Sequence, residues 1–281
     1  MSINWFPGHM VKARREIEEN IKLVDIVVML LDARAPFSCR NPELEKMAAR
    51  KKVVLVLNKM DLAERNAMRR HMATLRAEGF TVAAMDSLSG KGQREVLQAI
   101  GESYQSSAEA MLAKGRRVRP ARVMVVGVPN IGKSTFLNNL VGKKMAATGA
   151  KPGVTRGKQW IRVREDIELM DTPGLMWPKV GSEEQGNKLA LLDIVGEKAY
   201  DEYEVALYLV AWLENNQPAV LSDKFKLKEP NLVPEQIMES IARYRGYLVK
   251  GGAPDFEKTC KLLLQDFRKG KLGPVNLDSF N

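Results

Sequence analysis

The sequence predicts an α/β fold in which a mostly parallel, six-stranded sheet precedes an all-α C-terminal domain. Short apolar runs rich in β-branched residues alternate with helical patterns as far as residue 178, as in sheets built from β-α-β units. From residue 185 onward only helical patterns are left. We therefore expect one domain over residues 1–178, with an N-terminal aromatic and basic extension over 1–22, and a helical domain over residues 185–281.

Hydrophobic periodicity places the individual elements. Six apolar runs are the expected strands, over residues 26–31, 53–57, 81–85, 123–126, 158–163 and 167–170. Helical spacing predicts helices over residues 11–22, 43–51, 63–78 and 93–105. In the second domain we expect two apolar helical faces, formed by Ile237, Ile241, Tyr244 and Leu248 and by Phe256, Cys260, Leu263 and Phe267. Asp255 is the expected N-cap of the last helix.

The charge distribution favours an anionic partner. The net charge is +10, and the first 180 residues hold 31 Lys and Arg against 18 Asp and Glu, whereas the remainder holds 13 against 16. This excess suits nucleic acid, although a solvated basic face explains it equally well. No apolar run reaches the roughly 18 residues of a membrane span, and Cys39 and Cys260 lack metal-type spacing. We expect a monomeric cytoplasmic protein with unpaired thiols and no membrane partner.

Residues 127–134 match the phosphate-loop pattern GxxxxGK[ST] between an expected strand and an expected helix. In such a loop, backbone N–H groups surround phosphate oxygens, Lys133 reaches the β and γ phosphates, and the Ser134 hydroxyl ligates Mg²⁺. A glycine-rich turn is the alternative, but the flanking strand and helix favour nucleotide binding. The predicted nucleotide contacts of the loop are Asn130, Ile131, Gly132, Lys133, Ser134 and Thr135.

A second motif predicts which base is bound. Residues 58–61 read Asn58-Lys59-Met60-Asp61, the NKxD tetrad that reads guanine. An Asp carboxylate accepts from both N1–H and the 2-amino group of guanine, whereas adenine offers no such pair of donors. Asp86 and Ser87 follow the next strand in a loop that resembles the guanine-contacting Ser-Ala-x motif, with Leu88 in place of alanine. NKxD and the phosphate loop together predict a site for GTP and GDP.

Two further motifs concern the γ-phosphate. Thr155 lies in a Gly/Pro loop and is the candidate switch threonine, contacting Mg²⁺ and the γ-phosphate. Residues 171–174 read DxxG, in which Asp171 holds Mg²⁺ through water and the Gly174 N–H faces the γ-phosphate. The predicted magnesium ligands are therefore Ser134, Thr155 and Asp171.

The order of these motifs is unusual. GTPases usually run phosphate loop, switch threonine, DxxG, NKxD and Ser-Ala-x, whereas here the order is 4-5-1-2-3, a circular permutation of a P-loop GTPase domain. A basic join over residues 107–120 connects the old chain ends. Its five basic residues between 114 and 122 contact RNA phosphates or form a solvated connector. DxxG now leads directly into the helical domain. A movement of DxxG on loss of the γ-phosphate can therefore be passed along the chain to the helices.

On these motifs, together with the opening Trp5-Phe6-Pro7-Gly8-His9-Met10, the chain resembles the circularly permuted ribosome-assembly GTPases over nearly its whole length. The resemblance implies GTP hydrolysis coupled to a late step in assembly of the large ribosomal subunit. It also implies binding to the precursor of that subunit, with the helical domain over residues 185–281 and the basic surfaces in contact with its ribosomal RNA. Two alternatives stay open: a GTPase of RNA modification or translation, and a regulator that responds to guanine nucleotides and hydrolyses them slowly.

Catalytic residues are harder to predict. The residue after DxxG is Leu175, where many GTPases have a glutamine that orients water, so we expect slow intrinsic hydrolysis that the ribosomal partner stimulates. His9 is the candidate substitute, because an imidazole hydrogen-bonds water near neutral pH; a solvated tail histidine is the alternative. Asn130 is a candidate ligand for K⁺, which would add positive charge beside the phosphates. His71 lies in a polar helical stretch and is expected at the surface.

Overall fold

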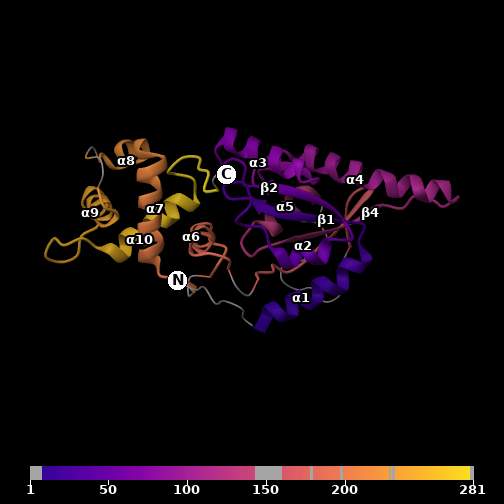
Figure 1. The fold of residues 1–281 in the computed structure, drawn as a ribbon, viewed down its shortest axis with the longest axis horizontal. Coiled ribbons are helices and arrows are strands. Elements are labelled where there is room, and N and C mark those ends of the chain that lie inside the picture. The colour runs from indigo at the N-terminus through magenta and orange to yellow at the C-terminus, as the bar shows by residue number, and fades with distance from the viewer. Residues whose placement is uncertain are drawn as a thin grey trace. The chain divides into compact units, whose positions relative to one another are not determined.

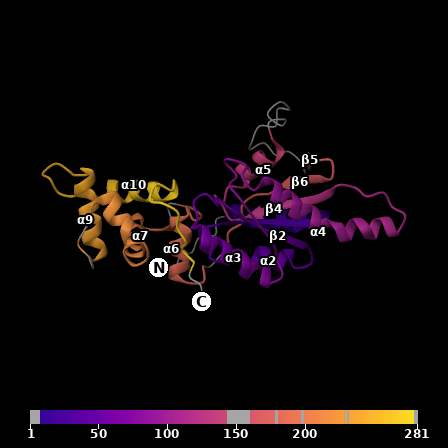
Figure 2. The ribbon, with the colours of Figure 1, turned by 90° about the horizontal axis from the view of Figure 1, so that it is seen from above.

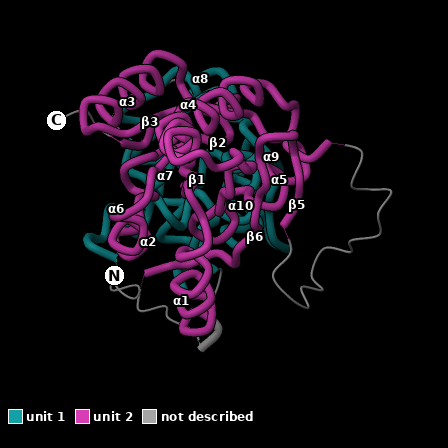
Figure 3. Tube along the Cα trace, turned by 90° about the vertical axis from the view of Figure 1, so that its right-hand side faces the viewer, with its two compact units in different colours: residues 1–5, 179–275 teal, residues 6–178, 276–281 magenta. Residues whose placement is uncertain are grey.

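A computed structural model of the chain describes residues 8–142, 160–177, 180–196, 199–227, 229 and 232–278, with the backbone alone at Gly8, His9 and Asp171 (Figure 1). The described residues fall into two compact units (Figure 3). One unit holds residues 8–177 together with 276–278, and the other holds residues 180–275. None of the helices formed by these residues is long and apolar enough to cross a membrane.

The first unit is built on a six-stranded sheet, which confirms the predicted fold class. Its strands run β3-β2-β1-β4-β6-β5, and every neighbouring pair is parallel except β5 and β6. All seven residues of β1 are buried, as expected for a central strand covered on both faces. The strands are β1 (Ile26–Asp32), β2 (Lys52–Asn58), β3 (Thr81–Met85), β4 (Ala121–Gly127), β5 (Trp160–Arg164) and β6 (Ile167–Asp171).

Helices cover this sheet and connect its strands (Figures 1 and 2). They are α1 (Gly8–Asn20), the 3₁₀ turn η1 (Ile21–Leu23), α2 (Pro42–Ala48), α3 (Arg65–Ala77), α4 (Gln93–Ala113) and α5 (Lys133–Val141). Helix α4 packs on β1, β2 and β3, whereas α5 packs on β4, β5 and β6. Helix α1 begins three residues earlier than the apolar spacing predicts, so the backbone of His9 lies in its first turn.

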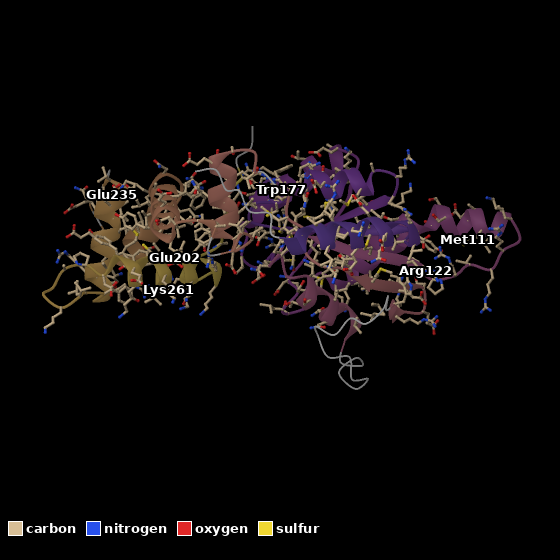
Figure 4. All side chains as sticks on the ribbon, turned by 90° about the horizontal axis from the view of Figure 1, so that it is seen from below. Met111, Arg122, Trp177, Glu202, Glu235 and Lys261 are labelled. Atoms are coloured by element: carbon tan, nitrogen blue, oxygen red, sulfur yellow. The ribbon has the colours of Figure 1, made fainter. Side chains whose placement is uncertain are left out.

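Helix α4 also extends eight residues beyond its predicted end. Tyr104 is the last of its buried side chains, and the following turns extend past the sheet, with Met111 near the outer end (Figures 1 and 4). The chain after the helix is held back against it, because Arg116 N–H donates to the Met111 carbonyl (2.9 Å) and the Tyr104 hydroxyl donates to the Arg119 carbonyl (3.1 Å). The outer end of α4 and residues 114–118 therefore form an ordered projection, the α4 tip.

The second unit is helical. Its helices are α6 (Glu183–Leu191), α7 (Glu202–Asn216), α8 (Pro218–Phe225), α9 (Pro234–Arg245) and α10 (Phe256–Arg268). Helix α7 packs against all four others. Asp255 caps α10 as predicted, by accepting from Lys258 N–H at 3.0 Å. The predicted apolar face of α9 is shorter than expected, since Ile237 and Ile241 are buried but Tyr244 is 50% and Leu248 44% exposed. Both lie where the helix ends, beyond the turns that α7 and α8 cover.

The chain returns to the first unit at its C-terminal end. The sequence pattern placed residues 185–281 in one helical domain, but residues 276–278 belong with the sheet. Leu277 N–H donates to the Arg34 carbonyl at 2.8 Å, and the Asn276 and Asp278 side chains bond residues of the same unit. In Figure 1 the yellow segment that follows α10 accordingly runs toward α3. The helical unit is thus joined to the sheet unit at both of its chain ends.

Candidate functional site

The predicted motifs meet at one edge of the sheet. Strands β1, β2, β3, β4 and β6 are parallel, so the loops that follow them emerge at the same edge, which is where open α/β sheets bind ligands. These loops begin at residues 33, 59, 86, 128 and 172. The topology therefore assembles the phosphate loop, NKxD, the Ser87 loop and the described part of DxxG from distant parts of the chain.

The phosphate loop is shaped by its last glycine. Gly132 adopts φ +98°, and a Cβ there would lie 2.5 Å from Asn58 Nδ2, so only glycine fits. Helix α5 starts at the next residue, which directs its unpaired N–H groups and its positive dipole end toward the loop. Lys133 Nζ donates back to the carbonyls of Val128 (3.2 Å) and Gly127 (3.5 Å). Ser134, on the first turn of α5, is exposed.

NKxD contacts the phosphate loop directly. Asn58 Nδ2 donates to the Ile131 carbonyl at 2.9 Å, and Lys59 Nζ donates to the Asn130 carbonyl at 3.2 Å. Lys59 and Asn130 both adopt positive φ, at +58° and +54°, a conformation that non-glycine residues rarely use and that often marks functional sites. Hydrogen bonds from NKxD side chains to backbone carbonyls of the phosphate loop therefore hold the predicted base-reading segment against the predicted phosphate-binding segment.

The Ser87 loop completes this arrangement. The Ser87 hydroxyl donates to Asn58 Oδ1 at 2.6 Å, so Asn58 links all three loops. Asp86 accepts from Leu88 N–H at 2.9 Å, and Leu88 itself is exposed. The Asp61 side chain is exposed, although partial desolvation, helped by the negative charges of Asp86 and Asp32, raises its pKa. Its carboxylate is therefore open to a ligand at the edge of the sheet.

The segment after β6 packs onto the phosphate loop. The Thr172 hydroxyl donates to the Val125 carbonyl at 2.6 Å, and Leu175 N–H donates to the Gly127 carbonyl at 3.1 Å. A Cβ on Gly174 would lie 3.0 Å from Lys133 Nζ and 3.1 Å from Pro129 backbone atoms, so glycine allows this close approach. Strand pairing brings Asp171 opposite Val125. The Asp171 side chain, the His9 side chain and Thr155 lie outside the described residues.

Leu175 points away from solvent. Its side chain is 0% exposed, and its carbonyl accepts from Asn41 Nδ2 at 2.8 Å. Asn41 is itself fixed, because its Oδ1 accepts from Glu43 N–H (2.9 Å) at the start of α2. Both backbone groups of Leu175 are therefore bonded, and its side chain contributes to the core.

The sequence analysis did not identify an ion pair that lies beside NKxD. Asp32 and Arg34, at the end of β1, are 0% and 1% exposed, and Arg34 forms a bidentate pair with Asp32 at 2.8 and 2.9 Å. Lys59 Nζ lies 3.2 Å from the same carboxylate. Burial alone would raise the pKa of Asp32, but Arg34 and Lys59 hold it far below its usual range. The sequence did contain a sign of this ion pair, because Asp32 and Arg34 carry opposite charges where a buried strand ends.

His71 is a second difference from the prediction. It was expected at the surface but is fully buried. Its Nε2 lies 2.6 Å from Asn276 Oδ1, and its ring packs edge-on against Phe37. The prediction was wrong because Phe37 and Asn276, the residues that contact His71, both lie far from it in the sequence.

Fold and site together define a P-loop GTPase with a circularly permuted chain. A family model described as a 50S ribosome-binding GTPase matches residues 122–234. Ribosome biogenesis GTPase A of Priestia megaterium is 40% identical over 99% of this chain and 97% of that protein, and the Thermotoga maritima protein of the same name is 32% identical over 98% and 94%. The crystal structure of GNP-bound YlqF from T. maritima superposes with a TM-score of 0.69 at 27% identity, covering 95% of this chain and 97% of that one.

These similarities show the family. The chain belongs to the family of ribosome biogenesis GTPase A. It is a GTP hydrolase that binds GTP and GDP and takes part in ribosome assembly. The sequence motifs predicted the GTPase, and the resemblance to the permuted GTPases implied the ribosome. The relatives extend to Mitochondrial ribosome-associated GTPase 1 of Xenopus tropicalis, at 32% identity over 98% of this chain and 94% of that protein.

Proposed function

We propose that guanine nucleotide binds across the edge described above, with its phosphates on the loop 127–134 and its base on NKxD. Asp61 accepts from guanine N1–H and from the 2-amino group, because its exposed carboxylate faces the edge. Lys133 and the N–H groups at the start of α5 hold the phosphates. The observation that carries this proposal is the bonding of Asn58 and Lys59 to the carbonyls of Ile131 and Asn130, which joins the two motifs.

The donor set also suits Mg²⁺. Among the described residues, no group of three or more His, Cys, Asp or Glu side chains forms a metal cage. This fits Mg²⁺, which usually takes few protein ligands and completes its octahedron with phosphate oxygens and water. Ser134 would hold the ion directly, with Thr155 and, through water, Asp171. When bound, the ion neutralises charge on the phosphates.

We propose that His9 orients the attacking water. Leu175 cannot, because its side chain is buried and apolar. The backbone of His9 lies in the first turn of α1, which gives it an ordered position. We also propose that K⁺ binds beside Asn130, whose positive φ turns the loop at that residue. Equal hydrolysis rates in K⁺ and Na⁺ would contradict the potassium proposal.

We propose that the chain binds the precursor of the large ribosomal subunit and that hydrolysis accompanies a late step in its assembly. The printed names of the relatives and of the family model support a ribosomal partner. The α4 tip supports contact with ribosomal RNA. Lys114, Arg116 and Arg117 are exposed there, and none forms an ion pair with another residue of the described chain. Three cations on one ordered projection suit a phosphate backbone.

Co-sedimentation tests this proposal. Wild-type protein with a non-hydrolysable GTP analogue should sediment with large-subunit precursor particles, and with GDP it should not. The variant K114E/R116E/R117E should lose most of this binding at physiological salt, because each lost phosphate contact weakens association. The control R65E/R69E/R94E makes the same charge change at exposed positions on α3 and α4 and should bind like wild type. The proposal would be overturned if wild type failed to co-sediment even with the GTP analogue.

A further inference from the structure

The last described residues, Asn276, Leu277 and Asp278, form what we call the C-terminal strap. We propose that this strap holds the base-reading end of the nucleotide site in place, and that Asp278 and Asp32 are positioning residues for guanine. The inference rests on the proposed role of residues 58–61.

Asp278 is bonded to a loop 240 residues away in the sequence. Its Oδ2 accepts from the N–H groups of Phe37 (2.7 Å) and Ser38 (3.1 Å), and its Oδ1 accepts from the Ser38 hydroxyl at 2.5 Å. The Asp278 side chain is 5% and Ser38 9% exposed, so these are buried, charge-assisted hydrogen bonds. Loss of the carboxylate would leave buried donors without an acceptor.

The rest of the strap reinforces this contact. Leu277 N–H donates to the Arg34 carbonyl at 2.8 Å, next to the ion pair described above. Asn276 Oδ1 lies 2.6 Å from His71 Nε2, and Asn276 Nδ2 donates to the Asp278 carbonyl at 2.8 Å. The His71 ring packs edge-on against Phe37, with centroids 5.2 Å apart. Three successive strap residues therefore fix one loop, residues 33–41.

NKxD is contacted by the first residue of that loop and by Asp32, the last residue of β1. Ala33 N–H donates to the Asn58 carbonyl at 2.8 Å. Asp32, whose carboxylate is held by Arg34, lies 3.2 Å from Lys59 Nζ. Lys59 in turn donates to the Asn130 carbonyl of the phosphate loop. A continuous set of bonded groups thus runs from Asp278 through the loop to the base-reading motif. We infer that release of the strap loosens the base more than the phosphates.

Nucleotide dissociation and base selectivity test the inference. Dissociation of a fluorescent GDP from the full chain should be about tenfold faster in D278A than in wild type. Selectivity should also fall: wild type should prefer GDP to IDP, which lacks the 2-amino group, and D278A should lose most of that preference. Single-turnover hydrolysis at saturating GTP should stay within about twofold of wild type, since the strap hydrogen bonds described above go to Arg34, Phe37, Ser38 and His71, which are not proposed phosphate ligands.

The variant D25A is a matched control that distinguishes a specific effect of the strap from general destabilisation. The Asp25 carboxylate also joins distant segments, because it accepts from Arg122 N–H at 2.9 Å and from Arg119 at 2.8 and 2.9 Å. It lies before β1, at the opposite edge of the sheet from the site. D25A should therefore leave GDP dissociation and the GDP/IDP preference unchanged.

The inference is overturned if D278A and D25A behave alike in both measurements. The milder variant S38A, which removes only one bond to Asp278, should show an intermediate effect and provides the test if D278A does not fold. Failure of the underlying assignment looks different: wild type would then show no GDP/IDP preference, or D61A would leave that preference intact.

Discussion

At the scale of single residues, the position of Leu175 limits which group can orient the attacking water. Its position follows DxxG directly, yet its side chain is fully buried and both its backbone groups are bonded. A side chain at this position cannot turn toward the γ-phosphate unless the segment detaches from the phosphate loop and from Asn41. Another group must therefore position the attacking water, or intrinsic hydrolysis should be slow.

We predict that L175Q does not restore fast hydrolysis. The glutamine amide would enter a buried apolar site, at a cost of about 1–3 kcal/mol in the free energy of unfolding. Intrinsic turnover should stay within about threefold of wild type, because the amide cannot reach the water. Single-turnover hydrolysis and urea unfolding measure the two effects, with L175M as the control of similar volume. A rate increase of tenfold or more would show that this segment is free to turn outward.

His71 gives the protein a pH-dependent stability. Burial lowers the pKa of His71, and Arg70 lowers it further, while the hydrogen bond with Asn276 and the charge of Asp278 oppose the shift. The unfolded chain therefore binds a proton more readily than the folded one, so stability is lost as the pH falls below about 6.5. Urea unfolding between pH 7.5 and 5.5 should show this loss, and H71Q should show a smaller pH dependence. Equal slopes for the two proteins would contradict the assignment.

At the scale of elements, the DxxG segment packs closely on the phosphate loop. Gly174 makes this packing possible, because a Cβ there would meet Lys133 Nζ and Pro129. The segment continues toward the helical unit, so a displacement of Gly174 has a covalent path to α6.

G174A should impair GTP binding or hydrolysis more than GDP binding. The added methyl group would push against Lys133, the lysine proposed to reach the terminal phosphate, so GTP affinity or hydrolysis should fall by about tenfold or more. GDP affinity should change by less than about threefold, because the base and the remaining phosphates keep their contacts. The control G101A lies on α4, where a Cβ would meet only Arg164 at 3.6 Å. Equal losses for both nucleotides would indicate general damage to the loop.

The elements themselves were largely predictable. Buried strands such as β1 and β2 can be predicted from their apolar runs, and the phosphate loop and NKxD lie directly after strands. The end of α4 was missed because none of residues 106–113 is buried and because Ser106 and Ser107 are residues that favour helix ends and turns. The contacts of Asp278 with Ser38 and of Asn276 with His71 were missed because they join residues more than 200 positions apart, which local patterns do not record.

At the scale of the whole molecule, permutation changes where the chain enters and leaves the GTPase unit while the sheet stays intact. Along the chain, the helical unit (residues 180–275) follows residue 177, which is close to DxxG, and precedes the C-terminal strap. One of its chain ends therefore leads to the γ-phosphate side of the proposed site and the other to its base side. This connectivity suits a protein whose partner senses, and acts on, the bound nucleotide.

The most direct test of this account is GTP hydrolysis with and without large ribosomal subunits, in K⁺ buffer, for wild type and H9A. We predict slow hydrolysis by wild type alone and strong stimulation by the subunits. H9A should bind GTP normally but lose that stimulation. No stimulation of wild type would contradict the proposed ribosomal partner, and full stimulation of H9A would contradict the catalytic role of His9.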